Sequence, residues 1–210
     1  MRAYLMFAFD WEKGGPWNSR GISGMTRFMR DVWRISTADY ASKKPNDKAT
    51  RAVRRKTHQT IDKVGREIEG FSFNTALAAL MELRNTLTGA MKKANVSAKA
   101  WNEAVDSMLL MLAPIAPHIT EELWSARGNG YSIHQQSWPV FDAEAAKEDS
   151  IELVVQVNGK VRDKIEVSAG ISEEDAKATA LGSETVQRFI GDKEPRKIIV
   201  IRGRLVNIVV

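Results

Sequence analysis

Apolar side chains recur three, four or seven residues apart through the first half of the chain, a spacing that gathers them on one face of an α-helix. Four such stretches predict four long helices. Their core positions are Met25, Phe28, Met29, Val32 and Trp33; Val53, Thr57, Ile61, Val64 and Ile68; Phe73, Leu77, Leu80, Leu83, Leu87 and Met91; and Trp101, Val105, Met108 and Leu112. Short connections join these stretches, which favours antiparallel neighbours in a helical bundle.

Two prolines end the fourth helix. Pro114 and Pro117 each lack a backbone N–H, so the helix that ends near Leu112 cannot continue through them. Pro117 suits the first turn of a new short helix. We expect Leu123 and Trp124 at the far end of that helix to turn back onto the bundle and close it.

Beyond residue 150 the hydrophobic period changes from 3.6 to 2. Apolar and polar residues alternate on both sides of Asn158-Gly159, which predicts a β-hairpin. Ser172, followed by three acidic residues, begins one helix, and a second runs from Ser183 to a stop at Gly191. Strands at 198–201 and 205–210 complete the order ββααββ.

The hairpin loop is open to two readings. A two-residue loop pairs Val157 with Lys160 and so mixes apolar and basic side chains on one face. A three-residue loop places Val155 opposite Val161, with Gly159 at the left-handed position of a bulged turn. We favour the three-residue loop.

The predicted fold class is therefore multi-domain, with an α part followed by an α+β part. We expect an antiparallel helical bundle over residues 1–130, a linker over 131–150, and a small ββααββ domain over 151–210.

Positive charge is concentrated in one segment of the first part. Residues 43–66 contain nine lysines and arginines against Asp47 and Asp62, a local charge of +7, whereas the whole chain carries +5. A basic surface of this kind indicates a polyanionic partner, although a solvated helix face has the same composition. The candidate contacts here are Arg51, Arg54, Arg55 and Lys56.

Basic residues also follow the strands of the second part. Because a rigid strand holds them, they could bind phosphates with little loss of conformational entropy, or they could serve solubility alone. For the set as a whole we favour phosphate binding, with Arg162 and Lys164 on one polar side of a strand. The candidates are Lys160, Arg162, Lys164, Arg196, Lys197, Arg202 and Arg204.

Other kinds of chemistry find little support. The chain has no cysteine, which excludes disulfides and thiolate ligands, and Gly159-Lys160 lacks the preceding glycine of a phosphate loop. The longest apolar run, residues 108–117, is shorter than the roughly 20 residues of a membrane helix. We expect no catalytic residue, no metal and a cytoplasmic location. A metal hydrolase that uses His118 and Glu122 would need a bound metal.

Several motifs resemble one family of aminoacyl-tRNA synthetases. LAPIAPHITEELW resembles the last helix of the anticodon-binding bundle in class I enzymes of the leucine, isoleucine and valine group. RAYLMFAF and MTRFMRDVW resemble the first helices of that bundle in bacterial leucyl-tRNA synthetases. VVQVNGKVRDKIEV and RKIIVIRGRLVNIVV resemble the C-terminal domain of the same enzymes, so the likeness covers nearly the whole chain.

The resemblance implies a function in ATP-dependent leucylation of tRNA-Leu. It implies that the C-terminal domain meets the corner of the tRNA and that the bundle packs along its stem side. The positions carried over within the motifs are Lys160, Arg162, Arg196 and Lys197. The family's HIGH and KMSKS signatures do not occur in this chain, so we expect it to be inactive alone and to hold no cofactor. ATP and Mg belong to the full-length enzyme.

The expected partners are tRNA-Leu and the remainder of the synthetase chain, with the protein a monomer that binds no membrane. A free-standing adaptor whose bundle binds another protein is the alternative from a different class. An apolar surface patch without a basic stripe favours the adaptor.

Overall fold

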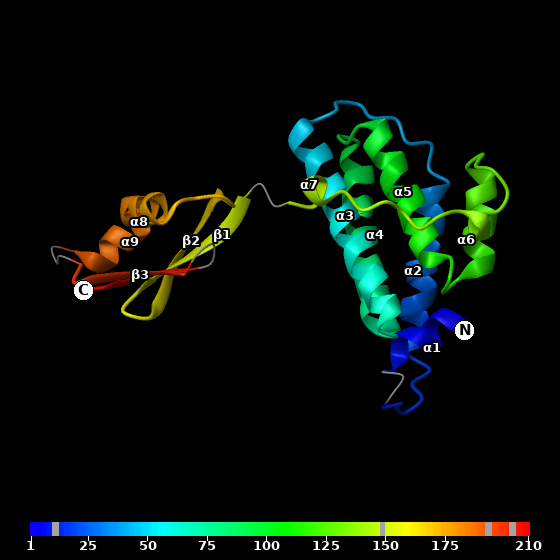
Figure 1. Cartoon of the computed structure of the whole chain (residues 1–210), viewed down its shortest axis with the longest axis horizontal. Helices are drawn as coiled ribbons and strands as arrows, with labels where there is room; N and C mark the ends of the chain where they lie inside the picture. The colour runs from blue at the N-terminus through cyan, green and yellow to red at the C-terminus, as the bar shows by residue number, and fades with distance from the viewer. Residues whose placement is uncertain (10–12, 148–149, 192–194, 202–204) are drawn as a thin grey trace. The chain divides into compact units, whose positions relative to one another are not determined.

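The computed structural model describes residues 1–9, 13–147, 150–191, 195–201 and 205–210 (Figure 1). The chain divides into two units, Met1–Lys147 and Glu148–Val210, and each has a hydrophobic core of its own. The fold is mixed, because helices of the first unit are followed by helices and a four-stranded sheet in the second.

The first unit is helical, and its long helices follow the predicted hydrophobic stretches. The elements are α1 (Arg2–Ala8), α2 (Gly21–Ser36), α3 (Asp47–Glu69), α4 (Phe73–Lys93), α5 (Ala98–Leu112), α6 (Pro117–Ala126), η1 (Ile133–Gln135) and α7 (Ala143–Ala146). The Asn46 side chain accepts a hydrogen bond from the Ala49 N–H at the start of α3, and the Ser97 side chain accepts one from the Ala100 N–H at the start of α5. Within the described part of the chain, no helix combines the length and apolar character that crossing a membrane requires.

The core of the first unit lies among α2, α3, α4 and α5 (Figure 1): α4 contacts the other three helices, and α3 also contacts α5. Phe28, Leu80 and Leu83 are fully buried in it. Trp101 is 1% exposed, and its ring stacks on that of Tyr40 with 4.1 Å between centroids. The Tyr40 hydroxyl also donates to the Val96 carbonyl, at 2.9 Å, so the segment before α3 is fixed to the start of α5.

The proline segment has the predicted form. Helix α5 ends at Leu112, and Pro117 occupies the first turn of α6. Leu123 and Trp124 are buried against the bundle, and the Trp124 indole N–H donates to the Gly130 carbonyl at 2.9 Å. The prediction that this helix closes the bundle is confirmed.

The segment from residue 131 to residue 147 is ordered against the first unit. The Nδ1 atom of His58 accepts a hydrogen bond from the Asp142 N–H at 3.2 Å, and the Gln59 amide donates to the Ala146 carbonyl at 3.0 Å. Both side chains belong to α3. The sequence of this segment has no periodic pattern, so contacts with a helix far earlier in the chain leave no local signal.

The second unit places two helices on one face of a mixed sheet (Figure 1). The elements are β1 (Ser150–Val157), β2 (Lys160–Ser168), α8 (Glu173–Gly182), α9 (Glu184–Ile190), β3 (Lys197–Ile201) and β4 (Leu205–Val209). The strand order is β2-β1-β4-β3, with β1 and β4 parallel and the other pairs antiparallel. Alternate residues such as Leu153, Val155 and Ile208 are buried beneath α8 and α9.

The expected three-residue hairpin loop is wrong. Val157 pairs directly with Lys160, and both turn residues have positive φ, 51° at Asn158 and 75° at Gly159. Two successive left-handed residues form the type I′ turn that a two-residue hairpin favours. The turn is also tied to β4, because the Gly159 N–H donates to the Asn207 side chain at 3.1 Å.

A β-bulge in β2 brings apolar side chains of the two strands opposite each other, which the three-residue loop was expected to do. The register shifts between Val155 and Gln156, and Arg162 is the additional residue on β2. Beyond it, Leu153 pairs with Ile165, so apolar side chains meet again on the covered face. The hairpin therefore does contain one additional residue, but this residue sits in the strand and not in the turn.

Candidate nucleic-acid interface

The bulge turns Arg162 toward helix α9. Its guanidinium carbon lies 3.9 Å from the centroid of the Phe189 ring. The arginine is half-buried, and its Nε is covered without a hydrogen-bond partner among the described residues. No described carboxylate pairs with Arg162, so its positive charge is not neutralised by the part of the protein that the structure describes.

The neighbouring Asp163 is engaged with the helices. Its Oδ2 accepts a hydrogen bond from the Ser183 hydroxyl and its Oδ1 accepts one from the Lys164 N–H at 2.8 Å. The bond from Ser183, followed by that from the backbone, holds the pKa of Asp163 below its usual value. This carboxylate is therefore ionised and committed to the start of α9, which leaves Arg162 free of it.

The expectation that Arg162 and Lys164 share one side of the strand is wrong. Ile165 packs on the core beneath the helices, so its neighbour Lys164 points to the open face of the sheet, where it pairs with Glu152 at 2.8 Å. The bulge places Arg162 on the opposite, helix-covered side. An additional residue in a strand reverses the side-chain alternation, which is the physical reason.

Arg196 and Lys197 lie at the opposite edge of the sheet from Arg162. Lys197 is exposed on the open face of β3, and Arg196 precedes it. Since β1 and β4 separate β2 from β3, three strand spacings, about 14 Å, lie between the two edge strands. The structure does not bring Arg162, Lys164, Arg196 and Lys197 into one cluster. Arg202 and Arg204 lie outside the described residues.

Two of the predicted cations of α3, Arg54 and Lys56, form ion pairs within the first unit. Arg54 pairs with Glu103 of α5 at 3.0 Å and with Asp142 at 3.6 Å, and hydrogen bonding to Glu103 raises the pKa of Arg54. Lys56 pairs with Glu82 of α4 at 2.6 Å, and that bond lowers the pKa of Glu82. Arg51 and Arg55 are engaged in interactions too. A role of these four residues in binding nucleic acid stays a prediction.

Helix α2 presents a basic face that the sequence analysis did not select. Arg27, Arg30 and Arg34 are spaced three and four residues apart, so they share one side of the helix, and all three are exposed. Arg34 pairs with Asp31 at 2.9 Å, whereas no described residue forms an ion pair with Arg27 or Arg30. Trp33, 44% exposed, lies at the edge of this α2 face. The spacing was visible in the sequence, but the denser charge of α3 obscured it.

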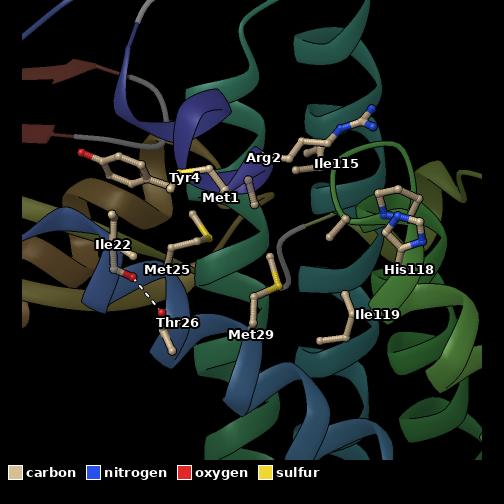
Figure 2. Close-up of a pocket in the computed structure, with 13 residues that line it drawn as sticks. Met1, Arg2, Tyr4, Ile22, Met25, Thr26, Met29, Ile115, His118 and Ile119 are labelled. Carbon is tan, nitrogen blue, oxygen red and sulfur yellow. Dashed lines mark hydrogen bonds between the residues drawn. The ribbon is translucent and has the colours of Figure 1, made fainter. Parts of the chain in front are cut away.

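The apolar side of α2 lines a pocket of about 480 Å³ together with α1, the start of α6 and the two residues before it (Figure 2). Met25, Met29, Ile115 and Ile119 line it, and the exposed His118 also contributes to the lining. Among the described residues, no group of three or more potential metal ligands comes together, so His118 and Glu122 have no third ligand there. The pocket provides apolar surface and no evident chemistry.

Known proteins resemble this chain in sequence and in fold. The profile of the family described as the anticodon-binding domain of tRNA ligase matches residues 50–177, which is more than half of the chain. The chain belongs to this family. The matched residues run from α3 to α7 of the first unit and continue into the second unit.

The relatives of this chain include leucine–tRNA ligases. The chain is 49% identical over 210 residues to the leucine–tRNA ligase of Dehalococcoides mccartyi and 44% identical over 210 residues to that of Herpetosiphon aurantiacus. In both cases the match covers 100% of this chain and 26% of the relative. The matched part is the C-terminal portion of these enzymes, so the chain spans about a quarter of their length.

A solved structure is similar over both units. It is the crystal structure of the ternary complex of Agrobacterium radiobacter LeuRS with tRNA and LeuAMS. The likeness covers 99% of this chain and 28% of that one, with 26% sequence identity and a TM-score of 0.83. The resemblance seen in the sequence motifs is confirmed, and the anticodon-binding domain of this chain is of the leucyl-tRNA synthetase kind.

Proposed function

We propose that this chain is the tRNA-binding part of a leucine–tRNA ligase and that it holds tRNA-Leu for leucylation by the rest of that enzyme. The observation that carries the proposal is the likeness to a LeuRS in complex with tRNA, which extends over 99% of the chain. The helical bundle and the ββααββ unit each bind the same RNA molecule. The chain works as a monomer beside the remainder of the ligase.

The two proposed RNA-binding surfaces carry positive charge that other described residues of the protein neutralise only little. On the bundle, the α2 face offers Arg27 and Arg30, which pair with no described carboxylate. On the second unit, Lys160 and Arg162 lie beside the hairpin turn, and Lys164 forms only an exposed ion pair, which is worth at most about 1 kcal/mol. Phosphate oxygens can engage such cations at little cost.

The basic α2 face argues against a protein-binding adaptor. An adaptor would present an apolar patch without a basic stripe, but α2 carries exposed arginines as well as the apolar wall of the pocket. Helix α2 therefore carries both an apolar side and a basic side, and the likeness to a LeuRS–tRNA complex favours RNA as the partner of the chain.

The proposal is tested by binding labelled tRNA-Leu to the chain and following fluorescence anisotropy at about 50–200 mM salt. We expect one chain to bind one tRNA, with affinity that falls as salt rises. Each phosphate that the protein neutralises releases counterions and so contributes about 0.7–0.9 to the log–log slope. Binding that is absent at the lowest salt, or that ignores salt, would contradict the proposal.

Alone, the chain is expected to catalyse no leucine-dependent exchange between ATP and pyrophosphate. We propose that ATP and Mg bind only to the other part of the ligase, since the HIGH and KMSKS signatures do not occur in this chain. The measurement is isotope exchange with purified protein, and a whole leucine–tRNA ligase serves as the positive control. Exchange that co-purifies with the chain would refute this assignment.

A further inference from the structure

Phe189 lies beneath an arginine that nothing else in the described structure holds. The guanidinium of Arg162 covers one side of its ring at 3.9 Å, yet the ring is 48% exposed. Exposed aromatic side chains are common on protein surfaces, so the exposure of Phe189 alone indicates no function. Here its neighbour is a cation.

The stack fixes the guanidinium where hydrogen bonds do not. The Nε atom is covered and has no acceptor among the described residues, and no described carboxylate pairs with the side chain. A free arginine loses up to about 2 kcal/mol of rotamer entropy when it is immobilised. Contact with an aromatic face removes part of that cost in advance, so the terminal amino groups are oriented before a ligand arrives.

The bulge is what makes this arrangement possible. Without the additional residue, strand alternation would place Arg162 and Asp163 on opposite faces of the sheet, so only one of them could face the helices. With it, Arg162 reaches α9 while Asp163 remains bonded to Ser183. Lys160, two residues earlier, pairs with the buried Val157 and so lies on the same side of the sheet as Arg162.

We infer that Phe189 is a positioning residue that holds Arg162 as a preformed binding group for a phosphate of the RNA backbone. The inference rests on the proposed function, since the phosphate is that of bound tRNA. The planar fork of arginine matches phosphate oxygens, and Lys160 adds a second positive charge beside it. Phe189 itself touches no phosphate and acts through the arginine.

The test is a double-mutant cycle on the whole chain with tRNA-Leu as the ligand. Phe189→Leu removes the aromatic face and Arg162→Lys keeps the charge but removes the planar fork. Each is expected to weaken affinity roughly three- to tenfold, the range of an exposed to partly desolvated cation–π contact. The double variant is expected to bind no more weakly than Arg162→Lys alone, because both changes remove the same contact.

Three further measurements separate positioning from a structural role. Phe189→Tyr keeps the aromatic face and is expected to bind within about twofold of the natural chain. Phe189→Leu is expected to keep the salt slope, because the charge remains, whereas Arg162→Ala lowers it by about 0.7–0.9. The matched control is Phe141→Leu, a phenylalanine of the first unit with 44% exposure, which is expected to leave affinity unchanged.

The inference is overturned if Phe189→Leu binds tRNA-Leu like the natural chain. It is equally overturned if the fold-losses of affinity of Phe189→Leu and Arg162→Lys multiply in the double variant. It is also overturned if Phe189→Leu and Phe189→Met both melt the second unit, since the ring would then be a structural residue. If the natural chain fails to bind tRNA-Leu at all, the proposed function fails first and this inference fails with it. If the natural chain binds tRNA-Leu but the losses of affinity of the two single variants add up in the double variant, the inference is refuted and the proposed function stands.

Discussion

Replacing Trp101 by alanine is expected to destabilise the first unit by about 3–5 kcal/mol, the range for removing a large aromatic side chain from a core. Trp101 is 1% exposed and stacks on Tyr40, whose hydroxyl fixes the start of α5. A loss of this size is a large part of the stability of an ordinary domain. The measurement is urea unfolding followed by tryptophan fluorescence, which reports on the first unit alone because all six tryptophans precede residue 139.

The matched control for this change is Trp33→Ala. Trp33 lies on α2 with 44% of its surface exposed, so its removal leaves no cavity and is expected to cost less than about 0.5 kcal/mol. If both variants unfolded at the same urea concentration as the natural chain, Trp101 would not belong to the core that the structure assigns to it.

Replacing Leu153 by alanine is expected to unfold the second unit while the first stays folded. Leu153 is fully buried beneath α8 and α9, and Leu→Ala changes in cores cost about 2–5 kcal/mol. A unit of roughly 60 residues has a single small core that supplies only about 3–5 kcal/mol. The expected result is loss of strand signal in circular dichroism with unchanged tryptophan fluorescence.

Val161→Ala is the control on the neighbouring strand. Val161 is 52% exposed on the open face, so its removal is expected to leave the second unit folded. The Leu153 prediction fails if the fluorescence transition of the first unit moves together with the loss of strand signal, because the two cores would then not be separate.

The helices could be predicted because their signals are local. A cap such as Ser97, an interrupted hydrogen-bond ladder such as that at Pro117, and a core stripe such as that of α4 all depend on residues within a few positions. These elements lie where the pattern placed them, and the end of α5 and the start of α6 agree with the prolines.

The hairpin could not be predicted fully because distant residues decide it. Asn207, nearly 50 positions later, accepts a hydrogen bond from the turn. The bulge at Arg162 shifts the strand register, while apolar and polar residues still alternate on each side of it. Parity in the sequence indicates that one residue is additional, but it does not indicate whether that residue lies in the turn or in the strand. The error mattered for the candidate site, because it placed Arg162 on the wrong face.

The candidate cations divide in the same way. Charge density in the sequence selected α3, yet Arg54 and Lys56 bind carboxylates on α5 and α4 that no local pattern reveals. Arg27 and Arg30 were visible at helical spacing, and only the structure shows that no described carboxylate pairs with them. Whether a cation has an ion-pair partner depends on residues that only the tertiary structure brings close, so it could not be predicted from the sequence.

The central claim is that this chain grips tRNA-Leu, and competition binding tests it most directly. Labelled tRNA-Leu bound to the chain is displaced by unlabelled tRNA-Leu or by a tRNA for another amino acid, across about 50–200 mM salt. We expect tRNA-Leu to compete at about tenfold lower concentration, equal to about 1.4 kcal/mol, and both tRNAs to show a steep salt dependence. Equal competition by the two tRNAs, with no salt dependence, would contradict the account.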